Sequence, residues 1–177
     1  LTVDELVRVR MNLRSVIKNG ILCLMALNGP LDFDNGAIVT LDKTNASRSN
    51  SKENHHFFPY ALRQQFVISQ DEVNSVLNFA FITKRLNQQI SAKHPSIYLQ
   101  QYEMENAEIR TCLLTHFIDE RAFAAAKRDD FKEFVNLRGT SILEKIQEVC
   151  HVEEQQNIIP VPEADEEPEE LYLFEDE

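Results

Sequence analysis

The 177-residue chain is long enough for one ordinary domain with a buried core, and two independent domains would be a tight fit. Its content of 43% hydrophobic and 27% charged residues excludes a collagenous or wholly unstructured protein. The net charge of -11 is uneven, because residues 152–177 hold 11 acidic residues and no Lys or Arg, whereas residues 1–151 hold 18 acidic and 18 basic residues. We therefore expect a neutral domain over residues 1–151 and a solvated acidic tail over residues 152–177.

The first predicted element is a helix. Thr2 and Glu5 have the spacing of a capping box. Apolar residues then recur at helical spacing, at Leu6, Val9, Leu13, Val16 and Ile17. This pattern predicts a helix over residues 2–18. We expect Asn19-Gly20 to interrupt it, before a second short helix that ends at the stop signal Asn28-Gly29-Pro30.

Short β-prone runs follow in the middle of the chain. Residues 37–41 and the run FAFI over residues 79–82 predict short strands, and HHFFP over residues 55–59 has the composition of a strand end. Residues 42–54 contain no large apolar residue, which is typical of a mobile surface loop. The sequence therefore predicts a small β component.

The remainder of the domain has a helical pattern. Thr83 is the expected N-cap of a helix over residues 84–90. Four more helices are predicted over residues 96–103, 106–117, 120–127 and 130–149. The predicted fold class is therefore α+β and predominantly helical. We expect a core motif over residues 37–92 within a helical surround over residues 1–28 and 95–150.

No segment predicts secretion or membrane insertion. The first residues lack a basic n-region and a cleavage site, and the start at Leu1 leads us to expect a piece of a longer protein. The longest apolar run, Ile21–Leu27, is far shorter than the roughly 20 residues that cross a bilayer. Cys23, Cys112 and Cys150 are widely spaced, so we expect no zinc site and a cytoplasmic location.

One group of polar residues has the composition and order of a catalytic site. His55 and His56 precede Pro59, Asn78 follows some twenty residues later, and Asn87 lies on the predicted helix 84–90. This order resembles the HNH motif of ββα-metal nucleases. HNH is a short motif, so its flanking sequence decides how specific the resemblance is.

The flanking sequence strengthens the resemblance. The segment VNSVLNFAFITKRLNQQISAKHPSIYL over residues 73–99 is similar to the one that follows the histidines in the C-terminal HNH domain of type IV modification-dependent restriction proteins, of the GmrSD and phosphorothioate-sensing type. Residues 31–36 upstream and Phe131, Phe134 and Arg138 downstream also look like that family. The resemblance spans roughly residues 20–150 and implies a ββα-metal (HNH) core embedded in a helical domain.

The resemblance implies a role for each motif residue. His55 is the expected metal ligand and His56 the general base, since a neutral imidazole accepts a proton from water near pH 7. Asn87 would complete the protein ligands through its carbonyl oxygen, and Asn78 would be a structural brace of the site. The ion would be one divalent metal, magnesium or manganese, with nickel as a third candidate, held weakly because the ligand pair is neutral.

The expected substrate is DNA, cut by phosphodiester hydrolysis in an antiphage restriction system. Residues 43–93 carry 7 basic against 3 acidic residues, which gives a local positive region for phosphates. Lys84, Arg85 and Lys93 lie on or beside the predicted helix and are candidate DNA contacts. The family implies phage or modified DNA as partner and an N-terminal nucleotide-hydrolysing sensor domain in the longer chain. It does not imply a membrane, and a homo-oligomer is compatible with it.

Other interpretations remain open from sequence. The chain is alternatively a catalytically inactive HNH-fold module that binds nucleic acid or protein, or an RNA-cutting toxin. His94, His116 and His151 are expected to be structural, and Arg138 is expected on a helix surface or in a salt bridge. The phenylalanines near the motif are expected in the core rather than stacked on bases. The acidic tail is either simple solvation or a mimic of DNA that covers the basic region.

Overall fold

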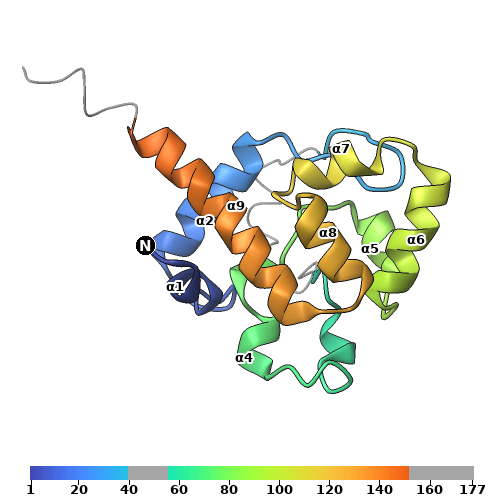
Figure 1. Cartoon of the computed structure of the whole chain (residues 1–177), viewed down its shortest axis with the longest axis horizontal. Coiled ribbons are helices and arrows are strands. Elements are labelled where there is room, and N and C mark those ends of the chain that lie inside the picture. The colour runs from blue at the N-terminus through green and yellow to red at the C-terminus, as the bar shows by residue number, and fades with distance from the viewer. Residues whose placement is uncertain (40–55, 152–177) are drawn as a thin grey trace, which may run out of the picture.

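The computed structural model describes residues 1–39 and 56–151, and these residues are predominantly helical, as predicted. The 42–54 loop, His55 and the 152–177 tail of the sequence predictions lie outside the described residues. In chain order the helical elements are α1 (Val3–Val7), α2 (Val16–Leu27), the 3₁₀ helix η1 (Tyr60–Leu62), α4 (Gln70–Val73), the 3₁₀ helix η2 (Val76–Asn78), α5 (Lys84–Ile90), α6 (Pro95–Glu105), α7 (Ile109–Leu114), α8 (Glu120–Lys127) and α9 (Phe131–His151) (Figure 1).

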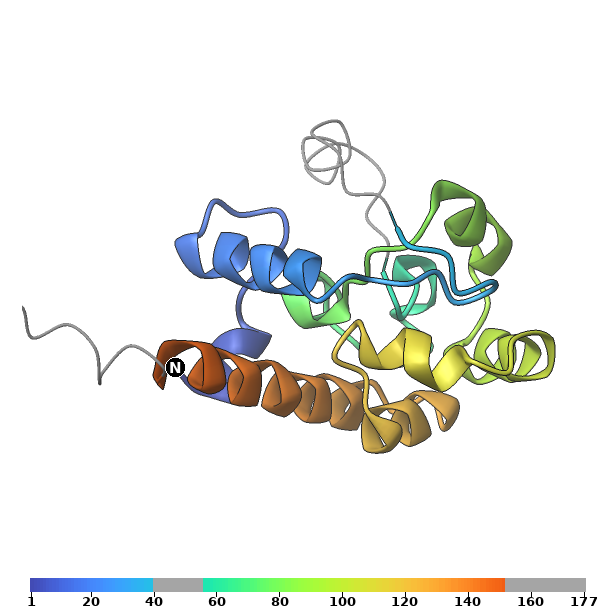
Figure 2. The same cartoon turned by 90° about the horizontal axis from the view of Figure 1, so that it is seen from above.

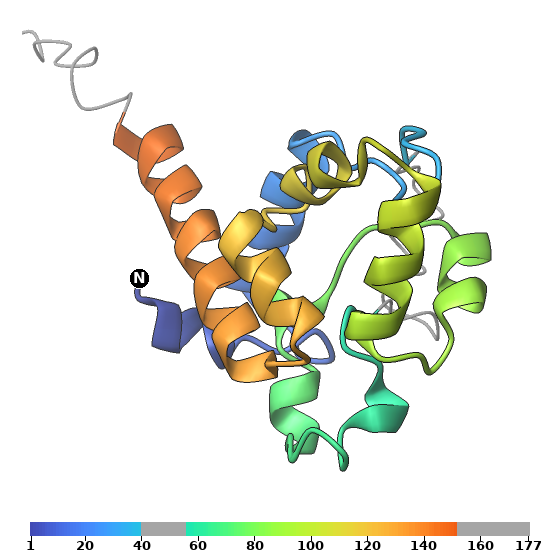
Figure 3. The same cartoon turned by 45° about the vertical axis from the view of Figure 1, so that its right-hand side comes forward.

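Helix α9 forms one side of the domain along most of its length. Its 21 residues rise about 30 Å at 1.5 Å per residue, and it packs against α8, α1 and η2. Figure 2 shows α2 in a second layer over α9. Figure 3 shows α8 beside α9, and α5 and α6 away from the C-terminal end of α9. No helix in this described part of the chain is long and apolar enough to cross a membrane.

The β component is smaller than predicted. The described residues contain isolated antiparallel bridges, Arg10 with Ser75, Leu31 with Ile38 and His56 with Phe79, rather than strands. The prediction of a strand over residues 79–82 is therefore wrong, because only Phe79 pairs before Thr83 caps α5. On the other side of this pairing, Pro59 has no N–H to extend a ladder and precedes η1 directly.

The N-terminal helix is shorter than its apolar pattern predicts. The Thr2 capping box is confirmed, since Thr2 accepts from the Glu5 amide and Glu5 accepts from the Thr2 amide. However, α1 ends at Val7, and the backbone of residues 9–11 pairs with residues 74–76 instead. The Val76 amide donates to the Val9 carbonyl at 2.7 Å, and the Met11 amide donates to the Asn74 carbonyl at 2.9 Å. These long-range bonds compete with the i to i−4 bonds that a helix over residues 2–18 would need.

The predicted helix break at Gly20 is also wrong. Helix α2 begins at Val16, with Ser15 accepting from the Lys18 amide as N-cap, and continues through Gly20. A glycine inside a helix costs about 1 kcal/mol relative to alanine, which the packing of a 12-residue helix can outweigh. The buried apolar residues of α2, Ile21 and Met25, are one turn apart and join the core.

The helices after residue 83 follow the sequence prediction closely. Thr83 caps α5 by accepting from the Leu86 amide, and α8 has the predicted bounds. Helix α7 is shorter than predicted because Asn106, its expected first residue, makes a turn instead. The Asn106 carboxamide accepts from the Glu108 amide and donates to the Phe33 carbonyl, both at 2.9 Å.

An aromatic cluster fixes the backbone that follows His56. Phe57 and Phe58 are buried, as predicted for core residues. The Phe57 ring stacks on Phe134 of α9 with centroids 4.6 Å apart, and the Phe58 ring contacts Phe131 edge-on at 5.3 Å. The Tyr98 hydroxyl of α6 also donates to the Phe57 carbonyl at 2.9 Å. Helices α6 and α9 therefore hold the segment that presents His56.

Candidate functional site

His56 lies at the edge of the core, half-buried, on the bridge to Phe79. Its ring centroid is 4.4 Å from that of Phe79, and its Nε2 is 3.1 Å from Oδ1 of Asn74. The Asn74 Nδ2 donates to the Gln70 carbonyl at 2.8 Å, which turns Oδ1 toward the histidine. Since Oδ1 only accepts, a neutral His56 carries its proton on Nε2, and Nδ1 is then the basic nitrogen.

Asn74 is a residue of this site that the sequence analysis missed. It sits at the C-terminal end of α4 and contacts His56 across 18 positions of the sequence. An Asn just after a capping box has no pattern that would single it out. Its carboxamide fixes the tautomer and the ring orientation of His56, which is what a general base requires.

Asn78 is completely buried, and every polar atom of its carboxamide is paired. Its Oδ1 accepts from the Phe58 amide at 2.8 Å, while its Nδ2 donates to the carbonyls of Phe58 at 3.0 Å and Val73 at 2.9 Å. Its backbone carbonyl also accepts from the Phe57 amide at 2.7 Å. Asn78 thus ties η2 to the two residues that follow His56 and has no atom left for a ligand.

Asn87 projects from the second turn of α5 and is half-buried. Its carboxamide makes no hydrogen bond to any described residue, so its oxygen is available to coordinate a metal ion. An amide oxygen suits a hard divalent cation such as magnesium or manganese. The other predicted ligand, His55, lies outside the described residues. Within residues 1–39 and 56–151 no group of three or more His, Cys, Asp or Glu side chains is placed so that it could hold a metal ion.

The three predicted DNA contacts differ in their surroundings. Arg85 is exposed and forms an ion pair with Asp34, whose hydrogen bond raises the pKa of the guanidinium. The Lys93 ammonium donates to Gln101 at 3.4 Å, and Lys84 is exposed at the start of α5. All three lie on one short stretch of chain, but Arg85 is already neutralised by a carboxylate.

The turn over residues 31–36 fastens the start of α5. The Thr83 hydroxyl donates to the buried Asp32 carboxylate at 2.5 Å, and Arg85 pairs with Asp34. Burial raises the pKa of Asp32, and this hydrogen bond opposes the rise. Asp32 and Asp34 thus contact Thr83 and Arg85, respectively, at the N-terminal end of the helix that carries Asn87. The partners are 51 positions apart in the sequence, so no local sequence pattern could reveal this contact.

His116 is buried in the core, a position that agrees with the structural role expected of it. It follows α7, its Nε2 donates to the Leu31 carbonyl at 2.9 Å, and its ring packs edge-on against Phe33. Burial lowers the pKa of His116 from 6.5 to about 3. The ring is therefore neutral in the folded protein at every pH above this value.

The buried His116 predicts a dependence of stability on pH. Below pH 6.5 the unfolded chain takes up a proton at this histidine and the folded protein does not, so the free energy of unfolding falls as the pH drops from 6.5 toward 3. In His116→Gln the amide can keep the bond to Leu31 without titrating. Urea denaturation at several pH values should show a shallower slope for this variant, by up to about 1.4 kcal/mol per pH unit. Equal slopes would contradict the neutral, buried assignment.

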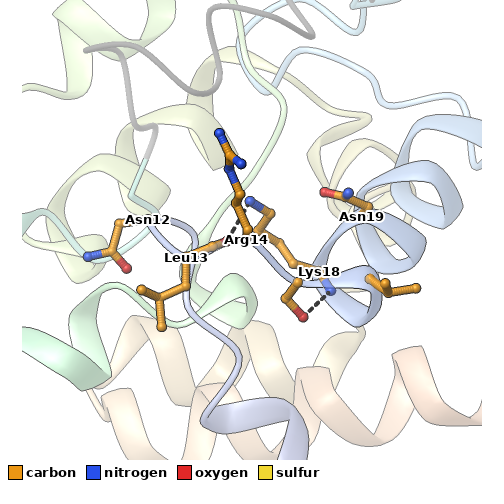
Figure 4. Close-up of a pocket in the computed structure, with 7 residues that line it drawn as sticks. Asn12, Leu13, Arg14, Lys18 and Asn19 are labelled. Atoms are coloured by element: carbon orange, nitrogen blue, oxygen red, sulfur yellow. Dashed lines mark hydrogen bonds between the residues drawn. The ribbon is translucent and has the colours of Figure 1, made fainter.

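A surface pocket elsewhere holds none of the predicted site residues. It lies between residues 12–15 and the start of α2 (Figure 4). The buried Lys18 ammonium donates to the Leu13 carbonyl at 2.7 Å and to the Met11 carbonyl at 3.4 Å, so it stabilises the turn. Arg14 points away from the other labelled side chains in Figure 4. We therefore regard this pocket as a feature of the turn between α1 and α2 and not as a ligand site.

Comparison with known proteins gives one informative similarity. The chain is 30% identical over 155 residues to the uncharacterized protein MJ0686 of Methanocaldococcus jannaschii, an alignment that covers 73% of this chain and 25% of that protein. The chain thus spans about a quarter of the length of the curated relative it matches. No protein-family profile matches the chain, and no solved structure is detectably similar.

Proposed function

We propose that this chain is a metal-dependent endonuclease domain of the HNH kind, which hydrolyses phosphodiester bonds in DNA as part of an antiphage restriction system. The observation that carries the proposal is the order of elements around His56. The bridge between His56 and Phe79 is followed at once by α5, which carries Asn87, and this order supports the proposal of a reduced ββα core.

His56 would act as the general base in this reaction. Its Nε2 lies 3.1 Å from Oδ1 of Asn74, a contact that orients the ring, and the neutral imidazole would accept the proton of the attacking water. The stack of Phe57 on Phe134 and the bonds of Asn78 to Phe58 keep the backbone after the histidine in place. A base that is already oriented loses little entropy when the substrate binds.

His55 and Asn87 would hold the divalent ion. When bound, the ion supplies positive charge that stabilises the charge developing on the phosphate and on the leaving oxygen. Asn87 suits this role because its carboxamide is uncommitted and α5 is anchored by Asp32 through Thr83. The neutral imidazole and amide pair predicts weak metal binding.

Lys84, Arg85 and Lys93 would bind phosphates that flank the cleaved bond. The Arg85 pair with Asp34 makes this arginine a better anchor for α5 than a phosphate ligand, because a phosphate would have to displace the carboxylate. Lys93, whose ammonium donates to the neutral Gln101, is therefore a stronger candidate than Arg85. A nucleotide-hydrolysing sensor domain in the longer protein and a cytoplasmic location are parts of the same proposal.

A nicking assay tests the proposed activity. Purified protein should convert supercoiled plasmid to the open-circular form with magnesium or manganese, and EDTA should stop the conversion. Labelled products should carry 5'-phosphates. Salt-sensitive DNA binding without cleavage under any divalent ion would favour an inactive binding module. Cleavage of RNA but not DNA in parallel reactions would favour the toxin alternative.

A further inference from the structure

Arg138 on α9 is the largest completely buried side chain of the described residues. The prediction that this arginine lies on a helix surface or in a salt bridge is therefore wrong. It makes no ion pair with any described carboxylate, and burial lowers the pKa of its guanidinium to about 9. An uncompensated buried cation is costly, and an apolar side chain of the same volume often serves stability as well or better. Its placement therefore calls for an explanation beyond packing.

The guanidinium holds two backbone carbonyls from separate parts of the fold. Its Nη1 donates to the Leu77 carbonyl at 2.7 Å, and its Nε donates to the His116 carbonyl at 3.0 Å. Leu77 is the middle residue of η2, and its carbonyl belongs to the peptide group that leads into Asn78. A planar guanidinium can span two such acceptors, whereas a lysine ammonium is a single point.

The next residue of α9 shows how closely this helix approaches η2. A Cβ placed on Gly139 would lie 3.1 Å from Cδ1 of Leu77 and 3.0 Å from Cγ1 of Val3. The glycine therefore permits the close contact that lets Arg138 reach the Leu77 carbonyl. From there the path to His56 is short, since Asn78 bonds to the amides of Phe57 and Phe58.

We propose that Arg138 is a positioning residue of the nuclease site, which fixes the peptide between Leu77 and Asn78 so that Asn78 holds residues 57 and 58 and, through them, His56. This inference rests on the proposed function. Arg138 itself touches no substrate. Its effect on catalysis passes through the Asn78 carboxamide, a contact that can be measured without any cleavage assay.

The test compares Arg138→Met, which keeps the volume and removes both hydrogen bonds, with Ile142→Ala, a cavity one turn further along the same helix. Below the melting temperature of both variants, Arg138→Met should lower kcat by about 10- to 100-fold with KM within about twofold, whereas Ile142→Ala should leave both unchanged. Arg138→Lys, which retains the charge and one donor nitrogen, should recover part of kcat. It serves as the main variant if Arg138→Met does not fold.

A second measurement does not depend on activity. In Arg138→Met, the Phe58 amide should exchange its hydrogen at least about tenfold faster and the Asn78 side-chain NMR signals should move, with neither change in Ile142→Ala. Wild-type kcat in Arg138→Met, or an unchanged Phe58 exchange rate, would overturn the positioning role. If the wild-type protein cuts no nucleic acid while the exchange result holds, the proposed function fails and the Arg138 contact stands.

Discussion

Replacing His56 by alanine is expected to slow DNA cleavage by about 100- to 10,000-fold, the contribution typical of a positioned general base. The fold should survive, because the His56 ring is only half-buried and its backbone bridge to Phe79 does not need the side chain. The rate is measured as single-turnover nicking of plasmid DNA, with circular dichroism to confirm folding. DNA affinity should stay within a few-fold of the wild-type value.

His94→Ala is the matched control for this variant. His94 is also half-buried and hydrogen-bonded, to Asp129 at 3.1 Å and to Gln65 at 2.9 Å, but neither partner belongs to the proposed site. The control should cut at nearly the wild-type rate. Equal losses in the two variants would point to a general loss of structure, and a fully active His56→Ala would remove the proposed base.

Replacing Asn78 by alanine is expected to have the largest effect on stability. It leaves the Phe58 amide, the Phe58 carbonyl and the Val73 carbonyl without the partner that each now has. A buried polar group without a partner costs about 1–3 kcal/mol, so the free energy of unfolding should fall by at least about 3 kcal/mol. Urea denaturation with a fluorescent or circular dichroism readout measures this change.

Asn136→Ala supplies the comparison, since Asn136 is an exposed asparagine on α9. Its effect should stay within about 0.5 kcal/mol. An Asn78→Ala variant that loses less than about 1 kcal/mol would show that these bonds do not hold η2 to the segment after His56. In that case Asn78 would not be the brace that the sequence resemblance implies.

The helices from α5 onward could be predicted because their signals are local. Thr83 supplies a cap, Leu86 and Ile90 face inward one turn apart, and α8 lies between Asp119 and Arg128 as its pattern indicates. The same use of local patterns failed at the start of the chain, where it predicted too long a helix. The apolar residues of 2–18 have helical spacing, yet residues 9–11 bond to 74–76, a partner that no local window contains.

Some residues of the candidate site could likewise be predicted from sequence patterns, and others could not. The histidine and asparagine pattern singled out His56 and Asn78, whose contacts are compatible with the predicted roles. Arg138 was misjudged from its charge, although it lies four residues from Phe134 and seven from Phe131 on one helical face, and both phenylalanines are buried. This spacing predicts that Arg138 lies on the buried face of α9.

The most direct test of the account is the position of a bound metal. Crystals soaked in manganese chloride should give one anomalous peak within coordination distance of the Asn87 carboxamide oxygen and of a His55 ring nitrogen, with the His56 ring facing the same space. Soaked crystals without a peak at Asn87, or with a peak held only by residues outside this group, would contradict a nuclease site built on His55, His56 and Asn87.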